Sequence, residues 1–215
     1  MGTPAPLDAV TVALCSFAAA MTRGREREAI AALVAARAAG ARRKAAEECA
    51  LMLMLYAGYP SALEGLRVLN AAWPGHARRT RGGTPARWRT RGEALCRRVY
   101  GPAYARLLPA VRALHPDLAL WMVEHGYGRV LSRGGLGVAQ RELITVAALA
   151  SLGWERQLVS HVLGALRVGA GETATHAALA VGAGMADAHG RAVAARTGQR
   201  AWRAERARPG TLPAR

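Results

Sequence analysis

Two residues in the C-terminal half of this sequence, Glu142 and His161, have the chemistry of a proton-transfer pair. A glutamate can orient and charge an imidazole, and an imidazole exchanges protons close to neutral pH. Apolar periodicity predicts a helix around each residue, over 141–152 and 154–168, joined at Gly153 into an antiparallel hairpin. Glu142 lies 11 residues before this glycine and His161 lies 8 after it. At ~1.5 Å per residue, both stand roughly 12–16 Å above the turn, so we expect the side chains to meet.

The same residues also allow an ordinary structural interpretation. Glu142 stands in the first turn of its helix, where the helix dipole favours an acid, and the adjacent Arg141 could pair with it at the surface. His161 shares an apolar stripe with Leu158 and Val162, and a lone histidine on such a face is usually a core residue satisfied by a hydrogen bond. Spacing alone leaves both interpretations open.

The remainder of the sequence predicts an all-α protein. Ala and Leu dominate, and no alternating apolar and polar segment is long enough to indicate a strand. Glycine and proline mark the breaks, above all in the segments AGYP and SRGGLG. Helices are expected over 8–22, 26–39, 43–57, 61–72 and 173–196, with two or three more within 92–128, one of them starting at Pro116.

An internal repeat relates the two halves of the chain. Residues 24–41 match residues 153–170 without gaps at an offset of 129, and the apolar helices before them fall into the same register. Alanines, Ala13 and Ala32, stand opposite the glutamate and the histidine, so only the second copy keeps the candidate pair. The predicted organisation is a degenerate N-terminal unit over 1–73, an Arg/Gly-rich linker over 74–92, a C-terminal unit with the site over 93–196, and a basic tail over 197–215.

The formal charge of +16 and two Arg-rich segments raise the question of nucleic-acid binding. One segment, 78–91, contains Trp88, which could stack on a base, and the other is the end of the chain from residue 191. Lys44 is the only lysine, however, and a surface that follows phosphates has no need to exclude lysine. We therefore favour a solvated linker and tail, and keep nucleic-acid binding as the less favoured alternative.

Cysteine spacing and hydropathy indicate where in the cell the protein is located. Cys15, Cys49 and Cys96 are odd in number, far apart and without metal-binding spacing, so neither a disulfide framework nor a metal site is predicted. The longest uncharged runs, such as 49–63, are too short to span a bilayer, and the N-terminus does not resemble a signal peptide. These features predict a cytoplasmic protein without a membrane segment.

Three segments together resemble the carboxymuconolactone decarboxylase family, which includes the alkylhydroperoxidase AhpD-like proteins. They are RELITVAALASLG, the histidine within SHVLGALRVGA, and YAGYPSALEGL. The segment HPDLALWMVEHGYGRVLSRGGLG further resembles what precedes the core in the decarboxylase branch. The resemblance implies an AhpD-like helical fold and a homo-oligomer, a trimer or a hexamer-like assembly. It also matches Glu142 and His161 to the glutamate and the histidine of the family site.

The resemblance further separates the two branches of the family. The two cysteines of the AhpD-like motif correspond here to Trp154 and Gln157, so a thiol peroxidase cycle lacks its sulfur atoms. The decarboxylase branch needs neither thiol nor cofactor. This favours cofactor-free decarboxylation or lactone processing of a small carboxylate, with His161 as the acid/base that Glu142 orients.

Six further residues are candidates for substrate contacts. They are Arg133 and Arg141, whose guanidinium groups could bind a carboxylate, Trp121 and Tyr127 as pocket walls, and Trp154 and Gln157 at the former cysteine positions. Two alternatives stay open: a peroxidase-related antioxidant protein, and a non-catalytic helical oligomer or Arg-rich nucleic-acid binder.

Overall fold

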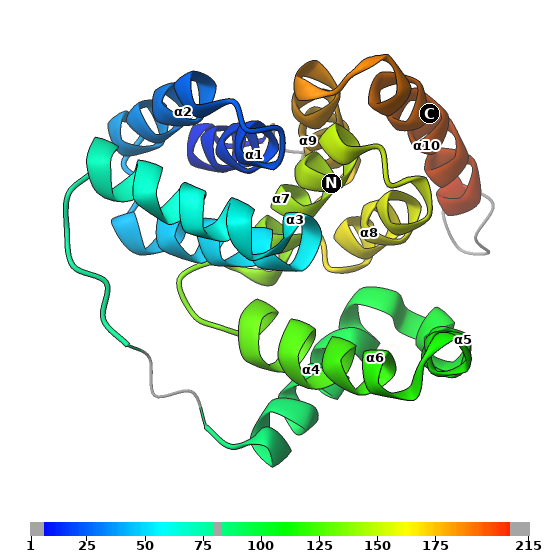
Figure 1. Ribbon diagram of the computed structural model, residues 1–215. Helices are drawn as coiled ribbons and strands as arrows, with labels where there is room; N and C mark the ends of the chain where they lie inside the picture. The colour runs from blue at the N-terminus through cyan, green and yellow to red at the C-terminus, as the bar shows by residue number, and fades with distance from the viewer. Residues whose placement is uncertain (1–6, 80–82, 207–215) are drawn as a thin grey trace.

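The computed structural model describes residues 7–79 and 83–206, and every regular element within them is helical (Figure 1). The elements in chain order are α1 (Ala9–Thr22), α2 (Glu26–Ala38), α3 (Arg43–Ala72), α4 (Pro85–Tyr100), η1 (Gly101–Ala103), α5 (Tyr104–Leu114), α6 (Pro116–Trp121), η2 (Met122–Leu131), α7 (Val138–Leu152), α8 (Glu155–Arg167), α9 (Glu172–Met185) and α10 (Ala188–Arg206). The predicted all-α class is thus confirmed. None of these described helices is long and apolar enough to cross a membrane.

The two units implied by the sequence repeat are visible in the helix bounds. Adding the offset of 129 to the first residues of α1, α2 and α3 gives the first residues of α7, α8 and α9. Helix α3 bends at Gly58, whose φ of 79° lies outside the helical range, and the equivalent residue, Asp187, separates α9 from α10. Each unit therefore contains the same succession of helices, and the fold is that of an AhpD-like protein with a duplicated unit.

Helices α1 and α7 form the contact between the two units. Polar residues at equivalent positions meet there: the hydroxyls of Thr22 and Ser151 lie 2.6 Å apart, and Gln140 donates from Nε2 to Thr11 Oγ1 at 3.1 Å. Both pairs are separated by the repeat offset, as expected when related surfaces face each other about a pseudo-twofold axis. Buried alanines fill most of the space between these polar pairs, which allows the helices to pack closely.

An insertion with no counterpart in the first unit stands between the two units. It consists of α4, α5, α6 and η2, lies at the bottom of Figure 1, and packs against α3 and α8. The prediction of a linker over 74–92 is wrong in its second half, because α4 begins at Pro85, after Thr84, whose hydroxyl accepts from the N–H of Arg87. Residues 80–82 lie outside the described part of the chain.

The glycines of this segment serve helix packing. A Cβ at Gly92 of α4 would lie 2.0 Å from the carbonyl oxygen of Val123, and a Cβ at Gly128 of η2 would lie 1.9 Å from that of Trp88. Real Cβ atoms cannot approach a carbonyl oxygen so closely, so α4 and η2 can touch only through glycine. Gly92, one of the glycines that suggested a linker, is thus required for a close contact between two helices.

The C-terminal helices also differ from the prediction of one helix over 173–196. The chain breaks at Asp187, whose carboxylate accepts from the N–H of Gly190 at 2.9 Å and pairs with Arg23 at 3.1 Å. A side-chain acceptor at this position starts a new helix, α10, which then continues to Arg206 into the predicted tail. Residues 207–215 of that tail lie outside the described residues.

A buried carboxylate, Glu48 on α3, connects three parts of the molecule. It accepts from Arg133, in the turn after η2, at 2.9 and 3.0 Å, and from Arg141 on α7 at 3.1 Å, while Lys44 Nζ lies 2.8 Å away. Glu48 is 0% and Arg141 2% exposed. Burial raises the pKa of Glu48, but the hydrogen bonds from its three cationic partners outweigh burial and hold this pKa below the usual value.

We expect Glu48→Gln to destabilise the fold strongly. It removes the negative charge at nearly constant volume and leaves two guanidinium groups without compensation, which costs about 3–5 kcal/mol in the free energy of unfolding at pH 7. Because the folded-state pKa of Glu48 is lowered, its contribution is present above the usual value of about 4.5 and is lost as pH falls below it. Urea unfolding of wild type and variant should therefore converge in acid.

The matched control for this measurement is Glu64→Gln. Glu64 pairs with Arg67 at the exposed surface of α3, and such exposed pairs contribute little to stability. A Glu48→Gln variant that is no less stable at pH 7 than Glu64→Gln would contradict the role assigned to the buried carboxylate.

Candidate functional site

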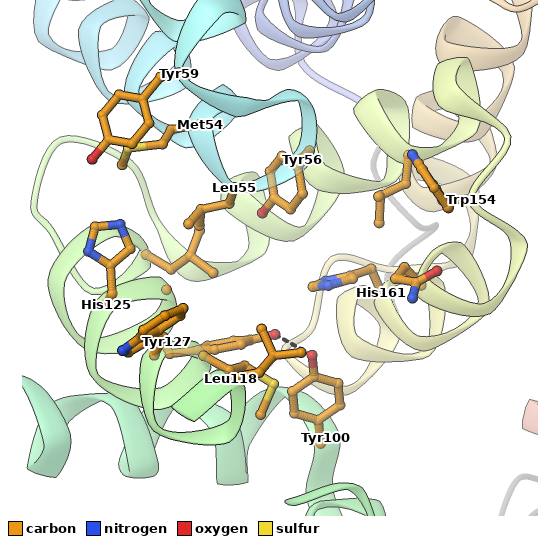
Figure 2. Close-up of a pocket in the computed structure, with 16 residues that line it drawn as sticks. Met54, Leu55, Tyr56, Tyr59, Tyr100, Leu118, His125, Tyr127, Trp154 and His161 are labelled. Carbon is orange, nitrogen blue, oxygen red and sulfur yellow. Dashed lines mark hydrogen bonds between the residues drawn. The ribbon is translucent and has the colours of Figure 1, made fainter. Parts of the chain in front are cut away.

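A pocket of about 590 Å³ opens between α3, α8 and the insertion (Figure 2). Its volume is within the roughly 300–1,000 Å³ typical of sites for small molecules. The lining combines aromatic, apolar and two histidine side chains: Met54, Leu55, Tyr56, Tyr59, Tyr100, Leu118, Trp121, Met122, His125, Gly126, Tyr127, Leu131, Leu149, Trp154, Gln157 and His161. All three parts of the fold, the two units and the insertion, contribute to it.

The predicted pair forms in the wall of this pocket. His161 Nδ1 lies 2.9 Å from Glu142 Oε2, and the two residues are 7% and 2% exposed. They come from α8 and α7, which the left-handed Gly153 joins into the hairpin expected from the sequence. The imidazole extends from α8 into the pocket (Figure 2). Glu142, the partner of its Nδ1 atom, does not line the pocket.

The partner of Nδ1 determines what His161 presents to a ligand. A carboxylate oxygen can only accept, so Nδ1 carries the hydrogen of the neutral ring and Nε2 keeps its lone pair. Among the described residues, Nε2 has no hydrogen-bond partner. The ring edges of Tyr56 and Tyr100 pack around the imidazole, with centroids 6.4 and 6.2 Å away. In this tautomer, the unpaired Nε2 of His161 is available to a molecule in the pocket.

A glycine on α8 makes room for the glutamate. A Cβ at Gly164 would lie 2.7 Å from Glu142 Oε2 and 2.8 Å from Val99 Cγ1. Only a residue without a side chain lets the carboxylate rest against the backbone of α8, one turn after His161. The equivalent position in the first unit is Ala35, which stands where no glutamate must be accommodated.

Three tyrosines supply hydroxyl groups to the pocket: Tyr100 and Tyr127 are buried, and Tyr56 is half-buried. Tyr56 shares a hydrogen bond of 2.6 Å with Thr145, and Tyr127 donates to Tyr100 at 2.5 Å (Figure 2). Burial raises the pKa of all three tyrosines above the ordinary value, so they remain protonated. Because Tyr100 accepts from Tyr127, its own hydrogen is available for an oxygen atom of a ligand.

A second histidine, which the sequence did not indicate, lies on the other side of the pocket. His125, on η2, is close to Tyr59 and Met54 in Figure 2, across the pocket from His161. Burial and the positive charge of Arg129 lower the pKa of His125 below its usual value. His125 is therefore neutral at physiological pH.

The structure brings together most of the residues predicted to bind substrate, but not all of them. Four of the six line the same pocket as His161: Trp121, Tyr127, Trp154 and Gln157. The two arginines do not line it. Arg133 and Arg141 instead converge on Glu48, the buried partner in the other unit that sequence reasoning missed.

The cysteines and the Arg-rich segment have structural surroundings. Cys15, Cys49 and Cys96 are buried free thiols away from the pocket, and burial raises the pKa of Cys49 and of Cys96 to about 12. Thiols of this kind are poor nucleophiles. Trp88, proposed above as a base-stacking residue, has the guanidinium group of Arg129 over its ring at 4.9 Å. The described residues contain no cluster of three or more His, Cys, Asp or Glu side chains that could hold a metal ion.

A duplicated helical unit whose second copy carries a Glu–His pair beside a pocket defines a protein of the AhpD-like class. Comparison with known families agrees with this geometry. The sequence model of the carboxymuconolactone decarboxylase family matches residues 1–71 and 116–197, and the chain belongs to that family. The matched stretches contain both repeated units up to residue 197 together with α6 and η2, and they leave out α4, η1 and α5. No curated protein matches the chain.

We expect Gly164→Ala to displace Glu142 from His161 without unfolding the protein. Crowding at this position lowers the free energy of unfolding by about 1–3 kcal/mol. The better helix propensity of alanine raises the same free energy by about 1 kcal/mol. The imidazole ¹⁵N chemical shifts of His161 should then show a smaller fraction of the Nδ1–H tautomer. Gly184→Ala is the control, because a Cβ there meets no atom within 4 Å. Unchanged ¹⁵N shifts in Gly164→Ala would contradict the positioning role of this glycine.

Proposed function

We propose that the protein is a cofactor-free enzyme that transfers a proton at a carbon next to a carbonyl group, in a decarboxylation or in the processing of a lactone. His161 is the general acid/base and Glu142 holds and charges it. The observation that carries this proposal is the 2.9 Å contact between the two side chains in the wall of a pocket. Membership in the carboxymuconolactone decarboxylase family supports the reaction class.

The arrangement suggests how each group acts. His161 Nε2 takes the proton from carbon, and the electron pair of that C–H bond forms an enolate on the neighbouring carbonyl. The carboxylate of Glu142 stabilises the resulting imidazolium, and Tyr100 donates a hydrogen bond to the enolate oxygen. The imidazolium then returns the proton to the carbon skeleton. In a decarboxylation, the C–C bond to the leaving CO2 supplies the electron pair, and a protonated His161 delivers the proton.

A thiol peroxidase function has less support. The motif positions next to the histidine hold Trp154 and Gln157, and the three cysteines are buried elsewhere. A peroxide reaching the pocket would find no thiolate there.

Hydrogen exchange in D2O tests the proposal on a panel of compounds rather than on a single substrate. Lactones and 3-keto acids are incubated with the protein, and deuterium incorporation next to the carbonyl and CO2 release are measured. For any compound that reacts, we expect His161→Ala and Glu142→Gln each to lower the rate by roughly 10²–10⁴-fold. Both variants should fold, since the first unit packs Ala32 at the position of His161 and glutamine keeps the volume of glutamate.

The control for this experiment is His76→Ala, an exposed histidine outside the pocket, which should leave the rate unchanged. Equal rates in wild type and His161→Ala would contradict the role of His161 as the general acid/base.

We also propose that the protein forms a homo-oligomer, a trimer or a hexamer-like assembly. The family resemblance supports this, as do apolar side chains exposed on neighbouring helices: Val34 on α2 is 58% and Leu63 on α3 is 63% exposed. Light scattering at micromolar concentration should return a multiple of 22.7 kDa. A mass of a single chain would reject the assembly.

A further inference from the structure

Aromatic side chains are concentrated at the pocket. The chain has only eleven aromatic residues, and six of them line this one cavity: Tyr56, Tyr59, Tyr100, Trp121, Tyr127 and Trp154. Three of the six are largely exposed at the rim, since Tyr59 is 65%, Trp121 59% and Trp154 56% accessible. Exposed aromatic rings around a concave surface are typical of sites that receive a flat, apolar ligand.

Formal charge, in contrast, is missing from the lining. Among the described residues, none that lines the pocket is Lys, Arg, Asp or Glu. The two arginines predicted from the sequence to hold a carboxylate, Arg133 and Arg141, bind the carboxylate of Glu48 instead. A ligand carboxylate in the pocket would thus lose its hydration without gaining an arginine partner.

The charge next to His161 is negative. Glu142 lies directly behind the imidazole and is 2% exposed. Burial raises the pKa of Tyr56 and of Tyr100, and the negative charge of Glu142 acts in the same direction. An anionic ligand would meet the field of this charge at the place where His161 has to contact it.

From this lining we propose that the pocket selects an uncharged, ring-bearing carbonyl compound, an unsaturated lactone or ketone, over a small carboxylate. The proposal rests on the function proposed above only for the carbonyl group that His161 contacts. Of the two reactions given there it selects lactone processing, because a decarboxylation needs a carboxylate substrate. The ring stacks on the aromatic wall, and the carbonyl oxygen accepts from Tyr100. The class of substrate is therefore set by burial of an apolar ring rather than by pairing of charges.

Two unreactive, isosteric probes separate these classes. 3-Phenylpropanamide and 3-phenylpropanoate have the same skeleton and differ in charge, and butanamide lacks the ring. Dissociation constants are measured by calorimetry at pH 7.5, and chemical-shift changes at His161 localise the binding. We expect the phenyl amide to bind at least about tenfold more tightly than the carboxylate and than butanamide, although the net charge of +16 attracts anions in general.

A gain of charge provides the complementary variant. Gln157 is exposed at the pocket, so Gln157→Arg should fold and add the missing guanidinium group. We expect it to tighten binding of the carboxylate at least about tenfold, the factor that one favourable pairing of about 1.4 kcal/mol provides. Gln199→Arg makes the same change of charge on α10, outside this pocket, and should not alter the preference.

The outcomes for the ligand class and for the reaction are distinct. A carboxylate that binds wild type as tightly as the amide, or failure of both phenyl probes to bind at millimolar concentration, overturns the ligand class. Preference for the amide without turnover of any compound supports the ligand class and rejects the proposed reaction. Turnover of carboxylates together with preferred binding of the carboxylate rejects the ligand class and keeps the reaction.

Discussion

The buried carboxylate of Glu48 is the constraint on which the pocket depends. Its partners are Arg133, which follows η2, and Arg141 on α7, so one side chain of α3 fixes three walls of the pocket relative to one another. Without the carboxylate, the guanidinium group of Arg141, which is 2% exposed, would be a buried charge without compensation. Nε and Nη1 of Arg141 have no hydrogen-bond partner among the described residues, so even the complete cluster leaves polar groups unsatisfied. Arg133 and Arg141 therefore have a structural role, and they bind Glu48 rather than a ligand.

Duplication explains why a unit without a site is retained. The first unit has Ala32 and Ala35 where the second has the histidine and Gly164, and so it cannot form a Glu–His pair. Its helix α3 nevertheless provides one wall of the pocket, from Met54 to Tyr59. The equivalent of Tyr56 in the second unit is Met185, whose sulfur lies 3.8 Å from Arg25. The two copies have therefore diverged in role: one holds the reactive pair, and the other encloses it.

The sequence could predict the parts of the site that depend on local geometry. The contact between Glu142 and His161 follows from two helices and one glycine turn, all within 30 consecutive residues. The partner of Arg141 could not be found in this way, because Glu48 lies 93 residues earlier and in the other unit. His125 was missed for a similar reason, since it reaches the pocket only through the fold of the insertion. The linker prediction over 74–92 failed at Gly92, because glycine is favoured both in linkers and at close contacts between helices.

The electrostatics of the site suit a reaction that creates charge. In the reaction proposed above for a neutral ligand, the imidazole of His161 lies between the Glu142 side chain and an uncharged carbonyl group. Proton transfer from carbon produces an imidazolium beside Glu142 and an enolate beside the hydroxyl of Tyr100. Both interactions are stronger in the transition state than in the ground state, which is the condition for accelerating a reaction. A carboxylate ligand would instead bring its own negative charge close to Glu142, and the enolate would add a further negative charge there. In the proposed reaction, Glu142 and the hydroxyl of Tyr100 therefore stabilise the transition state more than they stabilise the bound, uncharged substrate.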